Sequence, residues 1–188
     1  ALLAASLQYF SGLGADTKSQ FKFINISTDE VYGSLLINDD GFTEDSPLAP
    51  NSPYSASKAS SDLLARAFYK THSLPVIITR CSNNFGPFQH KEKFIPTIIS
   101  AALENKKIPI YGAGCQIRDW LFVEDHVEAL LQVAKKASPG ELFNVGGGTE
   151  LENIKLAQII CRQLEVKLKK PPGYYEKLIM FVEDRAGH

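Results

Sequence analysis

Two apolar runs of strand length, with a helical pattern between them, constrain the fold of this chain more than any other feature of its sequence. The runs cover residues 21–26 and 75–81, and each is continuous enough to be a strand buried on both faces. Between them, Ser52 and Pro53 predict the start of a helix that extends to about Thr71, because serine is a favoured N-cap and proline fits the first helical position. A strand, a helix and a strand in this order predict a βαβ unit, and therefore an α/β fold with a parallel sheet covered by helices on both faces.

The chain changes character after Gly86, where we expect a second, smaller α/β lobe. A loop at 88–93 leads into elements that the residue patterns place as helices at about 96–105, 124–136 and 151–164, and as strands at 108–111, 118–123, 141–145 and near 179–182. The basic, proline-broken stretch 166–175 predicts an exposed connection before the last strand.

Charge and composition exclude several classes of partner. The 188 residues contain 20 basic and 21 acidic side chains, so the net charge of -1 provides no field that would attract nucleic acid or an anionic membrane surface. The sequence has no run of about 18 apolar residues, which a membrane-spanning helix would require. Three widely spaced cysteines, Cys81, Cys115 and Cys161, indicate reduced thiols and support neither a disulfide framework nor a metal site. We therefore expect a cytoplasmic protein that acts on a small molecule.

Tyr54 and Lys58 lie four residues apart, so the predicted helix carries both side chains on the same face. An ammonium beside the phenol would lower the pKa of Tyr54 from its usual value of about 10, so that the phenol could accept the proton of an alcohol near neutral pH. Loss of that proton accompanies hydride abstraction from the carbon that bears the alcohol. Such a pair can also serve only solubility on an exposed helix, so the spacing alone identifies no reaction.

Polar runs follow both predicted strands, at the edge of the sheet where open α/β folds bind their ligands. Residues 27–30 read Ser-Thr-Asp-Glu after the first strand, and residues 82–84 read Ser-Asn-Asn after the second. Two carboxyl groups crowded in one site cannot easily both ionise, which would let one act as an acid and the other as a base. A polar turn without any chemical role is the alternative interpretation of Asp29 and Glu30.

The glycine-rich turn that binds a dinucleotide is absent from the sequence. Such a turn, G-x-G-x-x-G, follows a strand and places a helix N-terminus against the pyrophosphate. The run Gly-Leu-Gly at 12–14 has Thr17 at the third glycine position and precedes a strand, and the glycines at 146–148 come late and lack the spacing. The chain begins at Ala1 and has its only methionine at position 180, so we expect a piece of a longer protein, truncated at both ends.

Longer stretches distributed over the whole chain resemble a single family. They cover residues 26–33, 52–60, 81–87, 92–93, 110–112, 116–125, 144–147 and 184–188. These stretches are similar to the extended short-chain dehydrogenase/reductase family and, within it, to the dTDP-glucose 4,6-dehydratases. The run Thr28-Asp29-Glu30 distinguishes the dTDP-glucose 4,6-dehydratases from their relatives. Related epimerases generally have small or neutral residues at the two acidic positions. GDP-mannose dehydratases have a pattern similar to Thr-x-Glu, without the aspartate.

The resemblance implies an NAD-dependent lyase of deoxysugar (rhamnose) biosynthesis that oxidises C4 of dTDP-glucose, eliminates water across C5 and C6, and returns the hydride to C6. In this reaction Tyr54 would take the C4 hydroxyl proton, Thr28 would hydrogen-bond the C4 oxygen, and Glu30 and Asp29 would be the base and the acid of the elimination. The implied catalytic set is Thr28, Asp29, Glu30, Tyr54 and Lys58; the NAD-binding set is Ser27, Tyr54, Lys58, Ser82 and Asn84; and the nucleotide-sugar-binding set is Asn83, Lys93, Pro109, Tyr111, Arg118, Asn153, Arg185 and His188. No metal is implied.

The same resemblance implies a domain organisation and leaves alternatives open. Residues 1–87 would be the C-terminal part of a Rossmann-like, doubly wound NAD-binding domain, and residues 88–188 mainly a nucleotide-sugar-binding lobe, with a segment at about 112–150 returning to the first domain. The full-length protein would form a homodimer through the tyrosine-bearing helix and the helix before it. The alternatives are a UDP-glucose 4,6-dehydratase, a related NAD-dependent sugar-nucleotide epimerase, and a non-catalytic fragment that retains only the sugar-nucleotide lobe.

Overall fold

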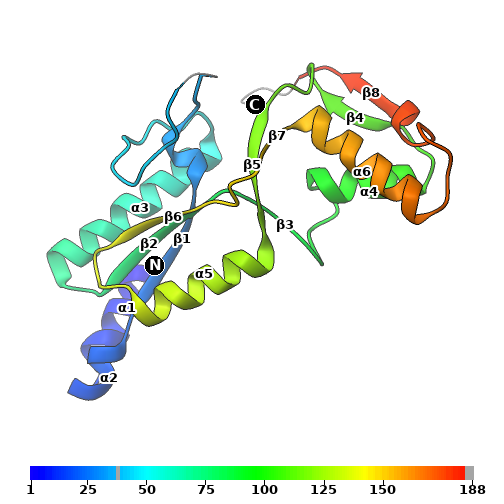
Figure 1. Cartoon of the computed structure of the whole chain (residues 1–188). Coiled ribbons are helices and arrows are strands. Elements are labelled where there is room, and N and C mark those ends of the chain that lie inside the picture. The colour runs from blue at the N-terminus through cyan, green and yellow to red at the C-terminus, as the bar shows by residue number, and fades with distance from the viewer. Residues whose placement is uncertain (37–38, 185–188) are drawn as a thin grey trace. The chain divides into compact units, whose positions relative to one another are not determined.

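The computed structural model describes residues 1–36 and 39–184. The chain forms two compact units, which we describe separately (Figure 1). Unit 1 consists of Ala1–Ser82 and Glu124–Gly146, and unit 2 consists of Asn83–Val123 and the chain from Gly147 onward. The expected NAD-binding domain (1–87) and nucleotide-sugar-binding lobe (88–188) are defined by their ligands. Their boundaries therefore stay predictions.

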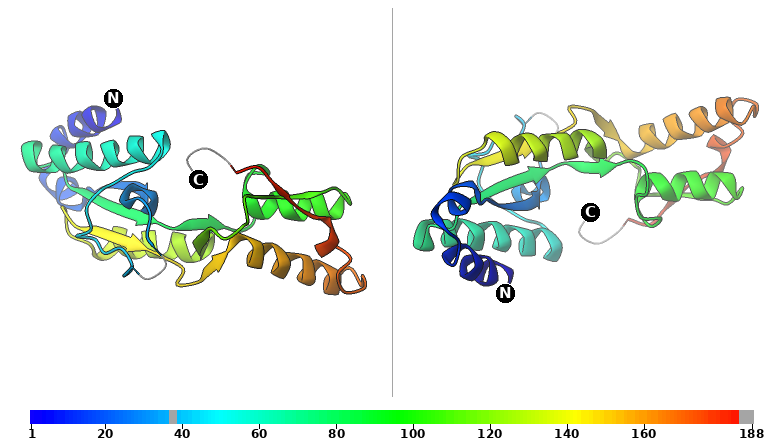
Figure 2. Two further views of the ribbon diagram at one scale, coloured as in Figure 1. Left: turned by 90° about the horizontal axis from the view of Figure 1, so that it is seen from above. Right: turned by 90° about the horizontal axis from the view of Figure 1, so that it is seen from below.

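Unit 1 is a three-stranded parallel sheet with helices on both faces. Its strands, in the order β1-β2-β6, are β1 (Phe23–Thr28), β2 (Val76–Cys81) and β6 (Leu142–Val145); its helices are α1 (Leu2–Ser11), α2 (Ala15–Gln20), the single 3₁₀ turn η1 (Asp29–Tyr32), α3 (Pro53–His72) and α5 (Val123–Lys136). Figure 2 shows α3 and α5 on opposite sides of this sheet. The predicted α/β class with a doubly wound parallel sheet is therefore confirmed.

The packing around β2 explains why its sequence is almost continuously apolar. Val76 and Ile78 pack with Ala65 of α3 on one face of the sheet. Ile77, between them in the chain, packs with Val133 of α5 on the other face. Successive side chains of a strand point to opposite faces, so a central parallel strand needs apolar residues at nearly every position.

The helix α3 begins where the sequence predicts. The Ser52 hydroxyl accepts a hydrogen bond from the Ser55 amide at 3.1 Å, and the Ser55 hydroxyl accepts one from the Ser52 amide at 3.0 Å, which closes a capping box. Pro53 occupies the first helical position. These local interactions place Tyr54 and Lys58 in the first two turns of the helix.

Unit 2 contains two small sheets and two packed helices. Its elements are β3 (Asn83–Phe85), α4 (Phe94–Leu103), β4 (Ile108–Tyr111), β5 (Ile117–Phe122), β7 (Glu150–Glu152), α6 (Asn153–Lys167), the 3₁₀ turn η2 (Glu176–Leu178) and β8 (Ile179–Val182). Strand β5 pairs in parallel with β3 and antiparallel with β7, and β4 pairs in parallel with β8. The helices α4 and α6 pack over a core that includes Ile98, Ile108, Ile110, Ala157 and Cys161.

The helices lie close to their predicted ranges. Helix α4 begins and ends two residues before the range predicted for it, and α6 begins two residues later and extends three residues further. Within the described ranges, no helix combines the length and the apolar character that crossing a membrane requires.

Candidate active site

Strand β1 ends in the polar run that the sequence indicates as chemically important. Ser27 and Thr28 are its last residues and are 3% and 8% exposed, whereas Glu30 is exposed. Thr28 caps η1, because the Glu30 amide donates to Thr28 Oγ1 at 3.3 Å, and the Thr28 hydroxyl donates to Asp29 Oδ1 at 3.2 Å. Thr28, Asp29 and Glu30 are thus held in one tight turn at the carboxyl end of a parallel strand.

Tyr54 projects from the first turn of α3 with about half of its surface exposed (55%). Its pKa is raised above its ordinary value, first because the phenol is partly buried and then because negative charge on Glu30, Cys81 and Asp29 disfavours the phenolate. An electrostatic effect of this kind requires the charged groups to lie near the phenol. Helix α3 also packs against β1 and η1, so the helix that carries Tyr54 lies beside the turn that carries both carboxyl groups.

The ammonium of Lys58 binds a backbone carbonyl of the neighbouring strand. It donates a 2.7 Å hydrogen bond to the carbonyl oxygen of Ile26 on β1, which ties α3 to the strand that carries the acidic turn. It is not among the causes that shift the pKa of Tyr54, and that pKa is raised instead of lowered. The direction of this pKa shift is therefore opposite to the one expected from the spacing of Tyr54 and Lys58, and the role of Lys58 toward the phenol stays a prediction.

Unit 1 also holds four of the five residues expected to bind NAD: Ser27, Tyr54, Lys58 and Ser82. The strand ends that carry the two serines are adjacent, since the Cys81 thiol donates to the Ser27 carbonyl at 3.4 Å. Ser27 Oγ is buried and has no hydrogen-bond partner among the described residues. A buried hydroxyl normally has a partner, so this atom is one that a ligand or a water can complete.

The residues of unit 1 fit one end of a dinucleotide and not the other. The buried Ser27 hydroxyl, the half-exposed phenol of Tyr54 and the ammonium of Lys58 provide polar groups of the kind that a nicotinamide ribose needs. The sequence has no glycine-rich turn after a strand, so these 188 residues do not provide the usual helix N-terminus for the pyrophosphate.

Unit 2 contains a pocket of about 180 Å³. Five residues that the sequence assigns to nucleotide-sugar binding line it together: Asn83, Pro109, Tyr111, Arg118 and Asn153. The other residues that line the pocket, none of which belongs to the nucleotide-sugar-binding set expected from the sequence, are Glu92, Phe94, Thr97, Ile98 and Trp120. A signal for one of them was present, since Trp120 stands two residues after Arg118 in a strand pattern and therefore shares its side of the strand.

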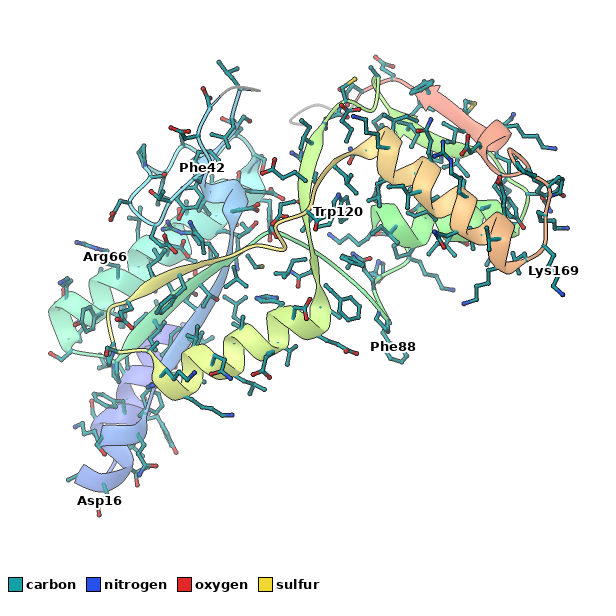
Figure 3. All side chains as sticks on the ribbon, in the orientation of Figure 1. Asp16, Phe42, Arg66, Phe88, Trp120 and Lys169 are labelled. Atoms are coloured by element: carbon teal, nitrogen blue, oxygen red, sulfur yellow. The ribbon has the colours of Figure 1, made fainter. Side chains whose placement is uncertain are left out.

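The pocket combines an aromatic wall with opposite charges. The rings of Phe94 and Trp120 stack at a centroid distance of 6.1 Å and an interplanar angle of 24°. Figure 3 labels Trp120 on β5, where it is buried. Arg118 contributes a guanidinium, which can bind two phosphate oxygens at once, and Glu92 contributes a carboxylate.

Two further residues expected to bind a ligand, Lys93 and Asn84, are not among the described residues that line this pocket. Lys93 precedes α4 between two lining residues, but it is not among the described residues that line the pocket. Asn84 lies on β3, where its backbone carbonyl accepts a hydrogen bond from the Gln89 amide group at 2.8 Å. Arg185 and His188 lie outside the described residues.

Comparison with known proteins places these features in a family. A family model described as GDP-mannose 4,6 dehydratase matches residues 2–188. The dTDP-glucose 4,6-dehydratase of Neisseria meningitidis is 53% identical over the whole chain, which covers 54% of that protein. A crystal structure of the Bacillus anthracis dTDP-glucose 4,6-dehydratase in complex with NAD is 46% identical, with a TM-score of 0.82 over 98% of this chain and 53% of that one.

A second structure agrees with the first. The dTDP-glucose 4,6-dehydratase DesIV of Streptomyces venezuelae, with NAD bound, is 41% identical, with a TM-score of 0.84 over all of this chain and 52% of that one. The chain thus spans about half the length of the relatives that it matches. These matches confirm the resemblance that the sequence indicates. The chain belongs to the GDP-mannose 4,6 dehydratase family, and the members to which it is similar here are dTDP-glucose 4,6-dehydratases.

Proposed function

We propose that this chain carries the catalytic residues and the nucleotide-sugar pocket of an NAD-dependent lyase that converts dTDP-glucose to dTDP-4-keto-6-deoxyglucose and water. One observation carries the proposal. The capped turn η1, which carries Asp29 and Glu30 at the end of β1, packs against the helix α3 that carries Tyr54 in its first turn. A phenol and two carboxyl groups in one place provide the proton transfers that an oxidation followed by an elimination requires.

The cofactor would be NAD, held at its nicotinamide end by Ser27, Tyr54, Lys58 and Ser82, with Asn84 of unit 2 as a further predicted contact. When bound, NAD⁺ accepts a hydride from C4 of the sugar and returns it to C6. The known structures of two similar dehydratases contain NAD, which supports this part of the proposal.

The residues of unit 1 divide the proton transfers between them. Tyr54 takes the proton of the C4 hydroxyl as the carbonyl forms, and Thr28 hydrogen-bonds the same oxygen. The new carbonyl acidifies the C5 proton, which Glu30 removes, while Asp29 gives a proton to the C6 hydroxyl so that it leaves as water. Glu30 then returns a proton to C5 as C6 is reduced. The sum is the loss of one water with no net oxidation.

The nucleotide diphosphate would bind in the pocket of unit 2. Arg118 provides the charge that a diphosphate requires, and the stacked pair of Phe94 and Trp120 provides an apolar wall. Lys93, Arg185 and His188 are further predicted contacts. The residues that would read the base are not identified among the described lining residues, so UDP-glucose is the competing substrate.

We extend the proposal to a homodimer in the cytoplasm. Large apolar side chains are exposed on the two helices expected at the dimer interface: Leu2 and Tyr9 on α1, and Leu63 and Leu64 on α3. Exposed apolar surface of this kind is typical of protein contacts. The cytoplasmic part of the proposal rests on the three widely spaced cysteines, which the sequence predicts to be reduced thiols.

The test is a mass measurement on the intact protein. With dTDP-glucose and catalytic NAD⁺, we expect a product lighter by one water that carries solvent deuterium at C5 when the reaction runs in heavy water. Tyr54→Phe should abolish the reaction, and Tyr9→Phe, on the exposed side of α1, should leave it unchanged. A C4 epimer of unchanged mass would support the epimerase alternative. Faster turnover of UDP-glucose than of dTDP-glucose would show that the preferred nucleotide contains uracil instead of thymine.

The non-catalytic alternative rests on the missing glycine-rich turn. Calorimetry with NAD⁺ on the 188-residue chain addresses it, and we expect weak binding or none because the pyrophosphate lacks its usual site. Tight binding would contradict the alternative. Binding of dTDP alone, without NAD⁺, would show that unit 2 keeps its pocket.

A further inference from the structure

A buried ion pair lies beneath the acidic turn of unit 1. Arg80 Nε on β2 donates to Asp62 Oδ2 on α3 at 2.9 Å, with side chains that are 6% and 1% exposed. The other carboxylate oxygen of Asp62 accepts a 2.8 Å hydrogen bond from the Asn25 side chain on β1. Both oxygens of Asp62 are therefore engaged, and the pair is fixed to two strands and one helix.

The guanidinium of Arg80 lies over the ring of Tyr32, the last residue of η1. Its carbon lies 4.7 Å from the centre of the Tyr32 ring, within cation–π range. Phe42, labelled in Figure 3, stacks on the same ring at 4.9 Å with an interplanar angle of 20°. Tyr32 is only 3% exposed.

The hydroxyl of Tyr32 is fixed as well. It donates to Asn144 Oδ1 on β6 at 2.7 Å, and Asn144 is directly opposite Arg80 in the parallel ladder. The Asn144 amide also donates to Glu44 Oε1 at 2.9 Å, so the same residue holds the loop that contains Phe42. Tyr32 is thus located by contacts from β2, β6 and this loop.

Asp29 and Glu30 belong to the same short turn as Tyr32, because η1 has only four residues, Asp29–Tyr32. The contacts that locate Tyr32 therefore also limit where the two acidic residues lie. In one 3₁₀ turn, the position of the buried end determines where the exposed end projects. The buried end is also closed by the backbone, since the Ala49 amide donates to the Val31 carbonyl at 3.0 Å. Displacement of Tyr32 would therefore move the two carboxyl groups.

We infer that Arg80, Asp62, Tyr32 and Asn144 are positioning residues that hold η1 so that Asp29 and Glu30 are correctly placed for the elimination of water. This inference rests on the proposed function for the roles of the two carboxyl groups. We call these four residues the Arg80 network. They are buried or part-buried and act through η1, without contact with the sugar.

Stability alone does not account for the Arg80 network. Desolvation of two charges offsets most of their attraction, and buried ion pairs can often be replaced by apolar residues of similar volume without loss of stability. Arg80 occupies a strand whose other buried positions are mostly apolar. A charged residue at this position is explained by what it holds, which is the ring of Tyr32.

The test uses Tyr32→Phe in the intact protein, because this change removes one hydroxyl and keeps the ring. Hydrogen–deuterium exchange should become about tenfold faster at the amides of residues 29–33, which corresponds to one lost hydrogen bond, and should be unchanged in α5. With substrate, the elimination should slow by about 100-fold, the effect of a misplacement of roughly 1 Å. Oxidation at C4 should keep its rate, so that reduced cofactor accumulates and its absorbance rises.

A matched control separates positioning from general loss of stability. Val133→Ala opens a cavity under the opposite face of the sheet, away from η1, and should slow neither step selectively. The double variant Asp62→Leu/Arg80→Met removes the guanidinium without leaving an unpaired buried charge and should reproduce the defect of Tyr32→Phe. Arg80→Lys should show a smaller defect, because an ammonium keeps the charge and loses the planar contact.

Two outcomes would overturn the inference: unchanged exchange at residues 29–33 in Tyr32→Phe, or equal slowing of oxidation and elimination. If the wild-type protein released no water from any nucleotide sugar, the proposed function would fail instead. In that case the exchange measurement still decides whether the Arg80 network holds the turn.

Discussion

Arg80 and Asp62 form an ion pair that is almost entirely buried, with 2.9 Å between Arg80 Nε and Asp62 Oδ2. The pair links the central strand of unit 1 to the helix that carries Tyr54. Each charge has lost its hydration and depends on the other, so removal of one partner leaves a charge in an apolar environment without compensation.

Asp62→Ala should therefore lower the free energy of unfolding of unit 1 by about 3–5 kcal/mol, the usual effect of breaking a buried pair. Urea unfolding followed by a unit 1 signal measures this change. The double variant Asp62→Leu/Arg80→Met should be clearly more stable than Asp62→Ala, because it leaves no unpaired charge.

A surface pair gives the control for this prediction. Lys106 and Glu104 approach to 2.6 Å but remain exposed, so Glu104→Gln should produce no measurable change in stability. Similar effects of Asp62→Ala and Glu104→Gln would show that the buried pair is not a structural requirement.

Tyr54 should ionise above pH 10 in the ligand-free protein. Burial and the negative charges of Glu30, Cys81 and Asp29 raise its pKa, and removal of one of these charges in Glu30→Gln should lower it. The difference in tyrosinate absorbance between the wild type and Tyr54→Phe isolates this one phenol from the other tyrosines. Glu128→Gln, on α5, should not shift the titration.

The sign of the linked stability follows from the same shift. Because the folded-state pKa lies above the unfolded value of about 10, the folded state binds its proton more tightly. The contribution of Tyr54 to stability is therefore fully present below pH 10 and is lost as the pH rises through the folded pKa. A midpoint for Tyr54 below 10 would contradict both statements.

The sequence predicts the long elements because their patterns are local. The apolar run at β2 reflects burial on both faces, and the start of α3 follows from the capping pair Ser52 and Pro53 with Ser55. The strands β3 and β7 have only three residues each, which is too short for a period to be recognised, and both are defined by their pairing with β5.

The candidate site is predicted less evenly. The resemblance to a family identifies five residues that share the pocket of unit 2, but it does not identify Phe94 or Trp120 as their neighbours. Helix spacing predicts that Tyr54 and Lys58 share a face, but it does not predict the hydrogen bond that the Lys58 ammonium donates to the Ile26 carbonyl. Arg80 offers a signal that can be used, since an arginine inside an apolar strand requires a buried acceptor.

Gly147 should tolerate no side chain. A Cβ at this position would overlap the backbone carbonyl oxygen of Trp120, which cannot move without breaking β5. The Asp119 carboxylate also accepts hydrogen bonds of 2.7 Å from the Gly147 and Thr149 amides, so the turn has no freedom to shift. Gly147→Ala should cost more than about 4 kcal/mol, in the range of the most severe single substitutions.

Gly41→Ala is the matched control, because nothing lies within 4 Å of a Cβ there. Thermal unfolding of the two variants should show a large loss for Gly147→Ala and a change within about 0.5 kcal/mol for Gly41→Ala. A stable Gly147→Ala protein would mean that the turn between β6 and β7 can adopt another path.

Arg118→Met should weaken the binding of dTDP to the 188-residue chain by about 10- to 100-fold, since hydrogen bonds to charged groups contribute roughly 1.5–3 kcal/mol. Arg118 lines the pocket of unit 2, and methionine keeps much of its length while it removes the guanidinium. Calorimetry at two salt concentrations measures the change, and the wild-type affinity should fall more steeply with salt than that of the variant.

Arg162→Met is the control, because Arg162 binds Glu176 at 2.6 Å on the surface of the same unit and is not among the described lining residues. Equal affinities for wild type and Arg118→Met would place the diphosphate elsewhere, whereas an equal loss in both arginine variants would reduce the effect to net charge.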